Sequence, residues 1–271
     1  MKHTEMRIGI AGLGAIGRAL ARKLHQGAIP NVVFIGAVAG DRAKAQSFLK
    51  EIGCNAPLRS IEKLAADADL VVECAPAAAF AEIAAPVLAA GKKLMALSAG
   101  QLLRHPELVA LAKESGGQII VPTGALIGFD AVSAAAEGAI DSVKMITRKP
   151  VNGLIGAPYL VKNGIDISNL REPLRVFQGS ARDAAAGFPE NVNVAAALSL
   201  AGIGPDRTTI EIWADPNATR NMHRVVVEAD SARFEMAIEN VPSENPKTGR
   251  ITALSALAAL RKLTAPLRVG T

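Results

Sequence analysis

The sequence has only 2 cysteines and few aromatic residues among its 271 positions. Cys54 and Cys74 stand twenty positions apart, which excludes a CxxC zinc motif and a disulfide framework. Both fit reduced thiols of a cytoplasmic protein, and the sequence predicts no metal site. Aromatic residues make up 3% of the chain, too few for a surface that stacks nucleic-acid bases.

Long apolar runs and long basic runs are missing as well. No apolar stretch reaches the ~18 residues that cross a bilayer, so the sequence excludes a membrane-spanning helix. The 30 Lys and Arg against 25 Asp and Glu give a net charge of +5, which suits an anionic ligand. No basic block is longer than two residues, so neither nucleic acid nor a membrane is expected as a partner.

Strand-like and helix-like segments alternate through the first half of the chain. Five short apolar runs read as buried strands, at residues 7–11, 32–38, 70–75, 93–97 and 118–121. Helical stretches lie between them, at residues 15–25, 42–53, 77–90 and 106–114. This alternation predicts an α/β fold, with a parallel, doubly wound Rossmann sheet in a domain over residues 1–124.

The pattern changes after residue 124. Strand-like runs at 142–148, 173–177, 207–214, 223–228 and 232–239 predict a mostly antiparallel sheet. Helices are expected at residues 129–137, 180–186, 193–201 and 251–262. We therefore expect a second α/β domain over residues 125–248 that carries the substrate and dimer contacts, with the last segment, 249–271, packed back on the first domain.

A glycine turn follows the first predicted strand and opens the first predicted helix. Gly12, Gly14 and Gly17 form a GxGxxG pattern that also includes Ala15 and Ile16. The first glycine permits the tight turn, the second lets a pyrophosphate approach, and the third lets helix and strand pack closely. The helix N-terminus adds N–H groups and partial positive charge. This context predicts a dinucleotide site.

The end of the second predicted strand leaves the choice of dinucleotide open. An acidic residue usually stands there to hold the ribose hydroxyls, and this chain has Ala39. Asp41 follows two positions later and also fits the cap of the next helix. Arg42 could meet a 2′-phosphate. The cofactor is therefore NAD or NADP.

The reaction of such a cofactor needs a group that handles a proton near neutral pH, and histidine is the usual one. His3, His25 and His105 fall in a tail, at a helix end and before a proline, which leaves His223 as the best candidate. The alternative for His223 is a half-exposed strand histidine with one hydrogen bond. Tyr159 is a weaker candidate because it has no paired lysine at helical spacing. Glu73 reads as a structural residue of a buried strand, and Cys74 as a small core residue that could contact the cofactor.

Several further motifs resemble those of the L-aspartate dehydrogenase family, over nearly the whole chain. They are GLGAIG, VVECA, PTGALIGFDA, RKP, FPENVNVAAALSLAG, ADPNATRNMHR and ENVPSENPKT. The second half makes the resemblance specific, because many Rossmann proteins carry the glycine turn alone. The resemblance implies NAD(P)-dependent oxidation of L-aspartate to iminoaspartate, which hydrolyses to oxaloacetate and ammonia or feeds NAD biosynthesis. It also implies a homodimer.

The resemblance assigns the catalytic role to His223 and cofactor contacts to Ala125 and Asn193. Asn193 also fits the N-cap of its helix. From the strand order, we expect the nicotinamide near Ala75, Ser98 and Ala125. The candidates that bind the substrate carboxylates are Lys149, Ser243, Asn245 and Lys247, although a solvated surface charge is an equal interpretation for the lysines.

Other interpretations of the sequence remain open. A dihydrodipicolinate reductase-like protein would have adjacent histidines in its substrate motif, and this chain has none. A homoserine dehydrogenase-like protein would have a lysine and aspartate pair in its second domain, which we cannot place. An interpretation of a different class is a sensor or regulator that binds NAD(H) without turnover. Inactivity of both the unchanged protein and His223→Ala, with intact cofactor binding, would favour it.

Overall fold

The computed structural model describes residues 5–189, 192–242 and 249–270. Contacts within the chain divide it into two compact units, and each is described by itself. The first unit takes the chain up to Pro122 together with Ala253–Val269, and the second takes Thr123–Thr252. No helix of the described residues is long and apolar enough to span a membrane.

The first unit contains a parallel five-stranded sheet with the order β2-β1-β3-β4-β5. Its strands are β1 (Met6–Ala11), β2 (Val32–Val38), β3 (Leu70–Glu73), β4 (Lys93–Ala96) and β5 (Gln118–Ile120). Its helical elements are α1 (Ala15–His25), α2 (Arg42–Glu51), α3 (Ile61–Asp67), η1 (Ala77–Ala79), α4 (Phe80–Ala89), α5 (Ala99–Leu102), α6 (Glu107–Ser115) and most of α11 (Ile251–Thr264). The predicted α/β class with a parallel sheet is confirmed.

Two apolar cores lie on opposite faces of this sheet, because alternate residues of each strand point to opposite sides. One core joins Ile8 and Ile10 of β1 to α1, α2 and α11. The other joins Val71 of β3 to α3, α4 and α6. Both faces of the sheet are therefore covered, which explains why its strands read as nearly continuous apolar runs.

Helix α11 belongs to the first core although it is the last helix in the chain. Ala256 and Leu260 are fully buried there. The Arg261 side chain donates to the carbonyl of Ala28 at 2.6 Å, and the Thr264 hydroxyl donates to that of Pro30 at 3.2 Å.

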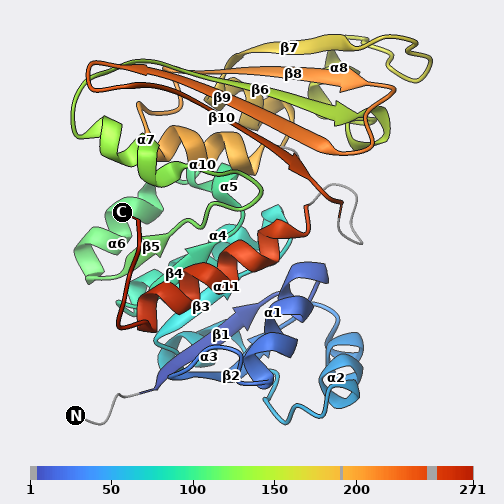
Figure 1. Ribbon diagram of the computed structural model, residues 1–271. Coiled ribbons are helices and arrows are strands. Elements are labelled where there is room, and N and C mark those ends of the chain that lie inside the picture. The colour runs from blue at the N-terminus through green and yellow to red at the C-terminus, as the bar shows by residue number, and fades with distance from the viewer. Residues whose placement is uncertain (1–4, 190–191, 243–248, 271) are drawn as a thin grey trace. The chain divides into compact units, whose positions relative to one another are not determined.

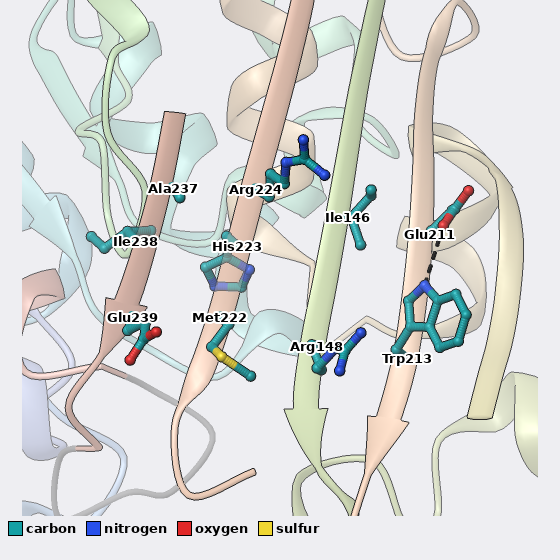
Figure 2. A pocket seen from close by; sticks show the side chains of 10 residues that line it. All are labelled: Ile146, Arg148, Glu211, Trp213, Met222, His223, Arg224, Ala237, Ile238 and Glu239. Carbon is teal, nitrogen blue, oxygen red and sulfur yellow. Dashed lines mark hydrogen bonds between the residues drawn. The ribbon is translucent and has the colours of Figure 1, made fainter. Parts of the chain in front are cut away.

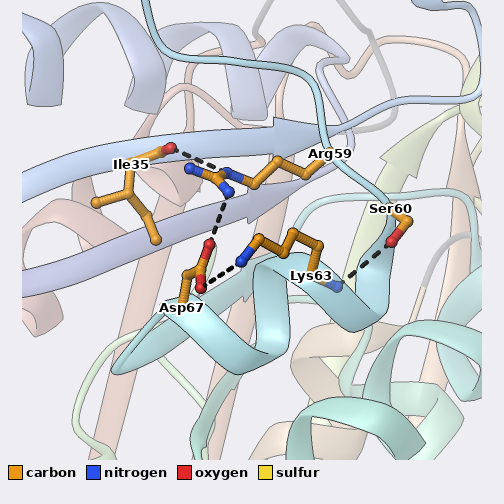
Figure 3. A network of polar contacts seen from close by, with 5 residues as sticks. All are labelled: Ile35, Arg59, Ser60, Lys63 and Asp67. Carbon is orange, nitrogen blue, oxygen red and sulfur yellow. Dashed lines mark hydrogen bonds and ion pairs between the residues drawn. The ribbon is translucent and has the colours of Figure 1, made fainter.

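A polar network stabilises the edge of this sheet (Figure 3). The Arg59 guanidinium donates to the carbonyl of Ile35 in β2 at 3.4 Å and to an oxygen of Asp67 at 2.6 Å. Lys63 contacts the other oxygen of Asp67 at 3.1 Å, and the Ser60 hydroxyl caps α3 by accepting from Lys63 N at 3.3 Å. The network therefore ties α3 to the outermost strand. Together with the bridge between Ala37 and Leu58, it covers part of an edge that would otherwise invite pairing with another chain.

The second unit contains a mixed five-stranded sheet with the order β10-β9-β6-β8-β7. Its strands are β6 (Ile140–Pro150), β7 (Leu174–Ser180), β8 (Thr208–Asp215), β9 (Asn221–Ala229) and β10 (Arg233–Asn240). Its helical elements are α7 (Phe129–Ala136), η2 (Val151–Gly153), α8 (Pro158–Lys162), α9 (Ala181–Gly187) and α10 (Asn193–Ala201). The β6–β8 pair is parallel and the other neighbours are antiparallel, as the predicted mostly antiparallel sheet requires.

The two faces of the second sheet differ. Figure 1 shows α7 and α10 along one face, which we call the inner face. It carries apolar side chains such as Val143, Met145 and Val225. The opposite, outer face carries Lys144, Ile146 and other residues that alternate with these, and no described helix of this unit covers it.

Several short elements escaped the sequence analysis. Helices α3, α5 and α8 have seven, four and five residues, too few to show a helical period. The strand predicted at 70–75 ends at Glu73, because Glu73 turns its carboxylate onto the next turn. Tyr159 of α8 is a core residue, since its ring packs against Phe177 and Phe188 with centroids 5.1 and 5.4 Å away.

Candidate functional site

The glycine turn between β1 and α1 has the geometry that a dinucleotide requires. Gly12 has φ +101°, and a Cβ there would lie 2.6 Å from the Cys74 carbonyl. A Cβ on Gly17 would lie 1.9 Å from the carbonyl oxygen of Gly12. At Gly14, by contrast, a Cβ would meet no atom of the described residues within 4 Å. Gly12 and Gly17 therefore permit close packing, and Gly14 leaves room for a ligand.

Helix α1 begins at this turn, and its first N–H groups are directed at the open space beside Gly14. Gly14 is the N-cap, no side chain caps the helix, and the first turn, which starts at Ala15 and Ile16, contains no acidic residue. Uncapped N–H groups and the positive end of the helix dipole favour an anion. The residues present therefore fit the pyrophosphate of a dinucleotide.

Glu73 organises the ends of β3 and β4. Its buried carboxylate accepts hydrogen bonds from Ala75 N at 3.0 Å, from Ser98 N at 3.0 Å and from the Ser98 hydroxyl at 3.1 Å. Burial raises the pKa of Glu73, and these hydrogen bonds oppose the rise. Glu73 is thus a structural residue, and it fixes Ala75 and Ser98, two of the predicted cofactor contacts.

The residues that follow β2 do not include a carboxylate that is available to bind a ribose. Ala39 follows the strand and packs against the apolar core. Asp41 caps α2 by accepting a hydrogen bond from Lys44 N at 2.9 Å. Arg42 donates to the carbonyl of Leu58 at 3.3 Å. Asp41 therefore serves as the helix cap that the sequence allowed for, and its cofactor role stays a prediction.

His223 lies near the start of β9 with its side chain buried on the inner face of the second sheet. Thr147 of β6 lies directly opposite, and its Oγ1 is 2.8 Å from His223 Nδ1. Burial and, to a smaller degree, the charge of Lys149 lower the pKa of His223 to about 3. His223 is therefore a neutral, buried imidazole, and not the half-exposed strand histidine that the sequence left as an alternative.

Lys149 lies two residues after Thr147 and on the same face of β6. Its side chain is 3% exposed, so the interpretation as a solvated surface charge is wrong. Burial lowers the pKa of Lys149 to about 8. A buried cation beside a neutral imidazole makes this region attractive to an anion, because charge interactions are strong where water is excluded.

Two asparagines extend this inner-face group. Asn221 and Asn240 are paired across β9 and β10, and both are buried. The Asn240 side-chain nitrogen donates to the carbonyl of Ala125 at 2.8 Å, which brings the turn at residues 124–128 to the end of the sheet that carries His223. That bond fixes the orientation of the amide, and Asn240 Oδ1 is buried with no hydrogen-bond partner among the described residues. The role of Ala125 as a cofactor contact stays a prediction.

The remaining predicted residues have different outcomes. Ser243, Asn245 and Lys247 lie outside the described residues. Asn193 does not take the N-cap position of α10 that the sequence allowed, because it is already the first helical residue and Val192 takes the cap position. The role of Asn193 as a cofactor contact stays a prediction. In the described chain, no three His, Cys, Asp or Glu side chains are placed to hold a metal ion.

Sequence reasoning missed Thr147, Asn221 and Asn240. A local signal existed for the first two, since strand alternation places Thr147 with Lys149 and Asn221 with His223 on one face. No local signal existed for Asn240, because its partner Ala125 is 115 residues away in the sequence.

The outer face of the same sheet has a hollow, lined by residues of β6, β8, β9 and β10 (Figure 2). Trp213 donates from Nε1 to Glu211 at 3.2 Å, and the Arg148 guanidinium lies 5.7 Å from the Trp213 ring. Glu211 also pairs with Lys144 at 2.8 Å, and this contact is the main reason that its pKa is lowered. The side chains of Met222 and Arg224 point to this face, opposite to that of His223.

Comparison with protein families gives a different match for each part of the chain. Residues 12–122 match the family model described as "Homoserine dehydrogenase, NAD binding domain". Residues 130–263 match the model described as "Aspartate dehydrogenase, C-terminal". Together with the glycine turn, these matches define the chain as an NAD(P)-dependent oxidoreductase.

Individual relatives make the assignment narrower. The chain is 56% identical to the L-aspartate dehydrogenase of Bradyrhizobium diazoefficiens, over 99% of this chain and 95% of the relative. It is 41% identical to that of Methanocella arvoryzae, over 98% and 99%. A crystal structure of aspartate dehydrogenase from Thermotoga maritima matches with a TM-score of 0.74 and 26% identity, over 98% and 100%. The chain belongs to the L-aspartate dehydrogenase family.

A homoserine dehydrogenase structure from Thiobacillus denitrificans shares the fold with a TM-score of 0.63 over 96% of this chain and 73% of that one, at 12% identity. The homoserine dehydrogenase-like interpretation therefore holds for the fold of the chain and not for its family. 

Proposed function

We propose that this chain oxidises L-aspartate to iminoaspartate with NAD or NADP. Aspartate loses a hydride from Cα and a proton from its nitrogen, and the C–N bond becomes double. The products are iminoaspartate, the reduced cofactor and a proton. Water then converts the imine to oxaloacetate and ammonia. The observation that carries this proposal is the buried group of His223, Thr147 and Lys149 in a chain 56% identical to an L-aspartate dehydrogenase.

The two units supply different parts of this chemistry. The first unit, through Gly12, Gly14, Gly17 and the start of α1, holds the dinucleotide. The second unit, through the inner face of its sheet, holds the substrate and handles its proton. When bound, the nicotinamide accepts the hydride.

His223 acts on the substrate nitrogen. A hydride can leave Cα only when the nitrogen lone pair can form the double bond, so the ammonium must first lose a proton. His223 is neutral and can accept that proton. A pKa of about 3 describes a weak base, but a bound dicarboxylate brings negative charge to the same region and raises the pKa of His223.

Lys149 provides the positive charge that a substrate carboxylate needs. It is buried, so its charge is poorly screened and its attraction to a carboxylate is strong. Binding of the carboxylate raises the pKa of Lys149 above the value of about 8 that burial imposes. Lys149 therefore binds the substrate as a full cation.

The test measures NADH and NADPH formation with L-aspartate, D-aspartate and L-glutamate. We expect turnover with L-aspartate, and a loss of about 10³-fold in kcat for His223→Gln, within the usual range for a general base. His105→Gln is the matched control, because the His105 ring lies in the first unit, where it contacts Glu107 at 2.8 Å. NADH binding by both variants should equal that of the unchanged protein. Absence of turnover with every substrate, despite NADH binding, would instead support a sensor.

We also propose a homodimer, formed through the outer face of the second sheet. This face exposes a hollow that includes Ile146, Trp213 and Met222. Arg224 and Glu235 add charges of both signs, so the surface can complement itself in a two-fold interface. The sedimentation coefficient should show a dimer, and the pair Ile146→Asp with Trp213→Arg should give monomers. Val161→Asp on α8 is the control, because Val161 is exposed and does not line this hollow.

The link to NAD biosynthesis belongs to this proposal as well. Iminoaspartate hydrolyses in water. Its use in biosynthesis therefore requires an enzyme that condenses the imine with a second substrate before water hydrolyses it. Adding such an enzyme, with its second substrate, should divert the product away from oxaloacetate.

A further inference from the structure

The imidazole of His223 has one hydrogen bond to the described residues, and that bond involves the nitrogen that faces its own sheet. Thr147 Oγ1 lies 2.8 Å from His223 Nδ1, across the antiparallel pair of β6 and β9. Both side chains are buried, at 2% and 3% exposure. The bond is therefore shielded from water and set by the register of two central strands.

We propose that Thr147 is a positioning residue that fixes the tautomer of His223. Its hydroxyl oxygen accepts the Nδ1 proton, which leaves the lone pair on Nε2 for the substrate. This inference rests on the proposed role of His223 as the base, and it adds the residue that decides which ring nitrogen performs that role.

The neighbours of His223 offer few alternatives to Thr147. On the same face, Met145 and Val225 are apolar, and so is Ile238, which lies opposite His223 on β10. Lys149 is the nearby cation, and an ammonium can only donate a hydrogen bond. The Thr147 hydroxyl is thus the polar partner that the structure places at Nδ1.

The reaction requires this arrangement in both protonation states of His223. A neutral imidazole carries one N–H, and it can take a proton at Nε2 only when that N–H is at Nδ1. After proton transfer both nitrogens carry hydrogen, and Nδ1 still needs an acceptor. Thr147 serves both states without turning its hydroxyl, whereas an apolar residue would leave a buried N–H without a partner in each.

The kinetic test compares two substitutions of nearly equal size. Thr147→Val keeps the shape and removes the acceptor, so kcat with L-aspartate should fall about 10- to 100-fold. The KM for L-aspartate should change less than about 2-fold, because the cation at Lys149 remains. Thr147→Ser restores the hydroxyl and should recover kcat to within about 3-fold. Melting temperatures report whether the variants fold.

A spectroscopic test reads the tautomer directly and needs no turnover. In protein labelled with ¹⁵N-histidine, the nitrogen without hydrogen resonates far from the one that carries it, and the His223 signals are identified by their absence in His223→Gln. We expect the proton on Nδ1 in the unchanged protein and in Thr147→Ser, and on Nε2 in Thr147→Val.

The two tests separate the failure of this inference from the failure of the proposed function. A proton on Nε2 in the unchanged protein, or full kcat in Thr147→Val, would overturn the inference and leave the activity standing. An unchanged protein without aspartate turnover, but with the Nδ1 proton lost in Thr147→Val, would overturn the activity and leave the tautomer assignment standing.

Discussion

The two sheets of this chain build their candidate sites by different means. The first sheet is parallel, is covered on both faces, and presents backbone at a glycine turn and a helix N-terminus. The second sheet is mixed, is covered by helices of its own unit on one face, and presents buried side chains from adjacent strands. Backbone groups suit the phosphates that every dinucleotide shares, whereas side chains provide the acid–base chemistry of one substrate. The comparison predicts that replacing glycines damages the first site most, and that replacing polar side chains damages the second site most.

Gly17→Ala should have the largest effect, a loss of stability. Gly14→Ala should have a smaller effect, on NADH binding. A Cβ at position 17 would lie 1.9 Å from a backbone oxygen, so β1 and α1 must separate, at a cost of about 3 kcal/mol or more. A Cβ at position 14 meets no described atom and should lower the melting temperature only slightly, because alanine is a poorer N-cap than glycine. It should weaken NADH binding about 10-fold or more by filling the space for the phosphates.

Calorimetric unfolding and NADH titration of both variants check this difference. Equal melting temperatures for Gly14→Ala and Gly17→Ala would contradict the separate roles of the two glycines. Normal NADH binding by Gly14→Ala would place the phosphates elsewhere.

The buried imidazole of the second sheet should make stability depend on pH. The pKa of His223 is about 3 in the folded chain and 6.5 when exposed, so between these values the unfolded state binds the proton more strongly. The free energy of unfolding therefore falls as pH drops from 7.5 to 5, by about 2 kcal/mol from this residue. His223→Gln lacks this contribution and should lose correspondingly less stability over the same range.

Urea unfolding at the two pH values measures this difference between the unchanged protein and His223→Gln. The His105→Gln variant should behave like the unchanged protein, since His105 lies at the surface. Parallel pH curves for the unchanged protein and His223→Gln would contradict the burial of an uncharged His223.

Glu73→Gln tests the part of the first site that depends on a side chain. The carboxylate accepts three hydrogen bonds, two of them from Ser98. An amide has one oxygen, so its NH₂ group must face an N–H donor, and about 1–2 kcal/mol of stability should be lost. Because Ala75 and Ser98 are predicted cofactor contacts, NADH binding should weaken about 10-fold. Ser98→Ala removes only the hydroxyl contact and should have the milder effect, and a reverse order would contradict this role of Glu73.

The contrast between the two sheets also explains what the sequence could predict. The bounds of α1, α10 and β2 were predicted to the residue, because apolar periodicity and glycines are local signals. The glycine turn was predicted for the same reason. The bond between Thr147 and His223 joins residues 76 positions apart, and that between Asn240 and Ala125 joins residues 115 apart. The first bond depends on strand register and the second on where a turn packs against the sheet, and alternation along one strand specifies neither.

Ala39→Asp should produce the smallest effect and would sharpen the cofactor assignment of the first sheet. Ala39 follows β2, where a carboxylate can accept hydrogen bonds from ribose hydroxyls and repel a 2′-phosphate. The KM for NADP should rise about 10-fold, or ~1.4 kcal/mol, while the KM for NAD stays the same or falls. Arg42→Ala is the matched variant. If the Arg42 side chain contacts the 2′-phosphate, this variant should weaken the binding of NADP and leave that of NAD unchanged. Because Asp41 already caps α2, Asp41→Asn should leave the ratio of the two cofactors unchanged. A ratio that responds to Asp41→Asn and not to Ala39→Asp would place the ribose against the cap of α2 instead.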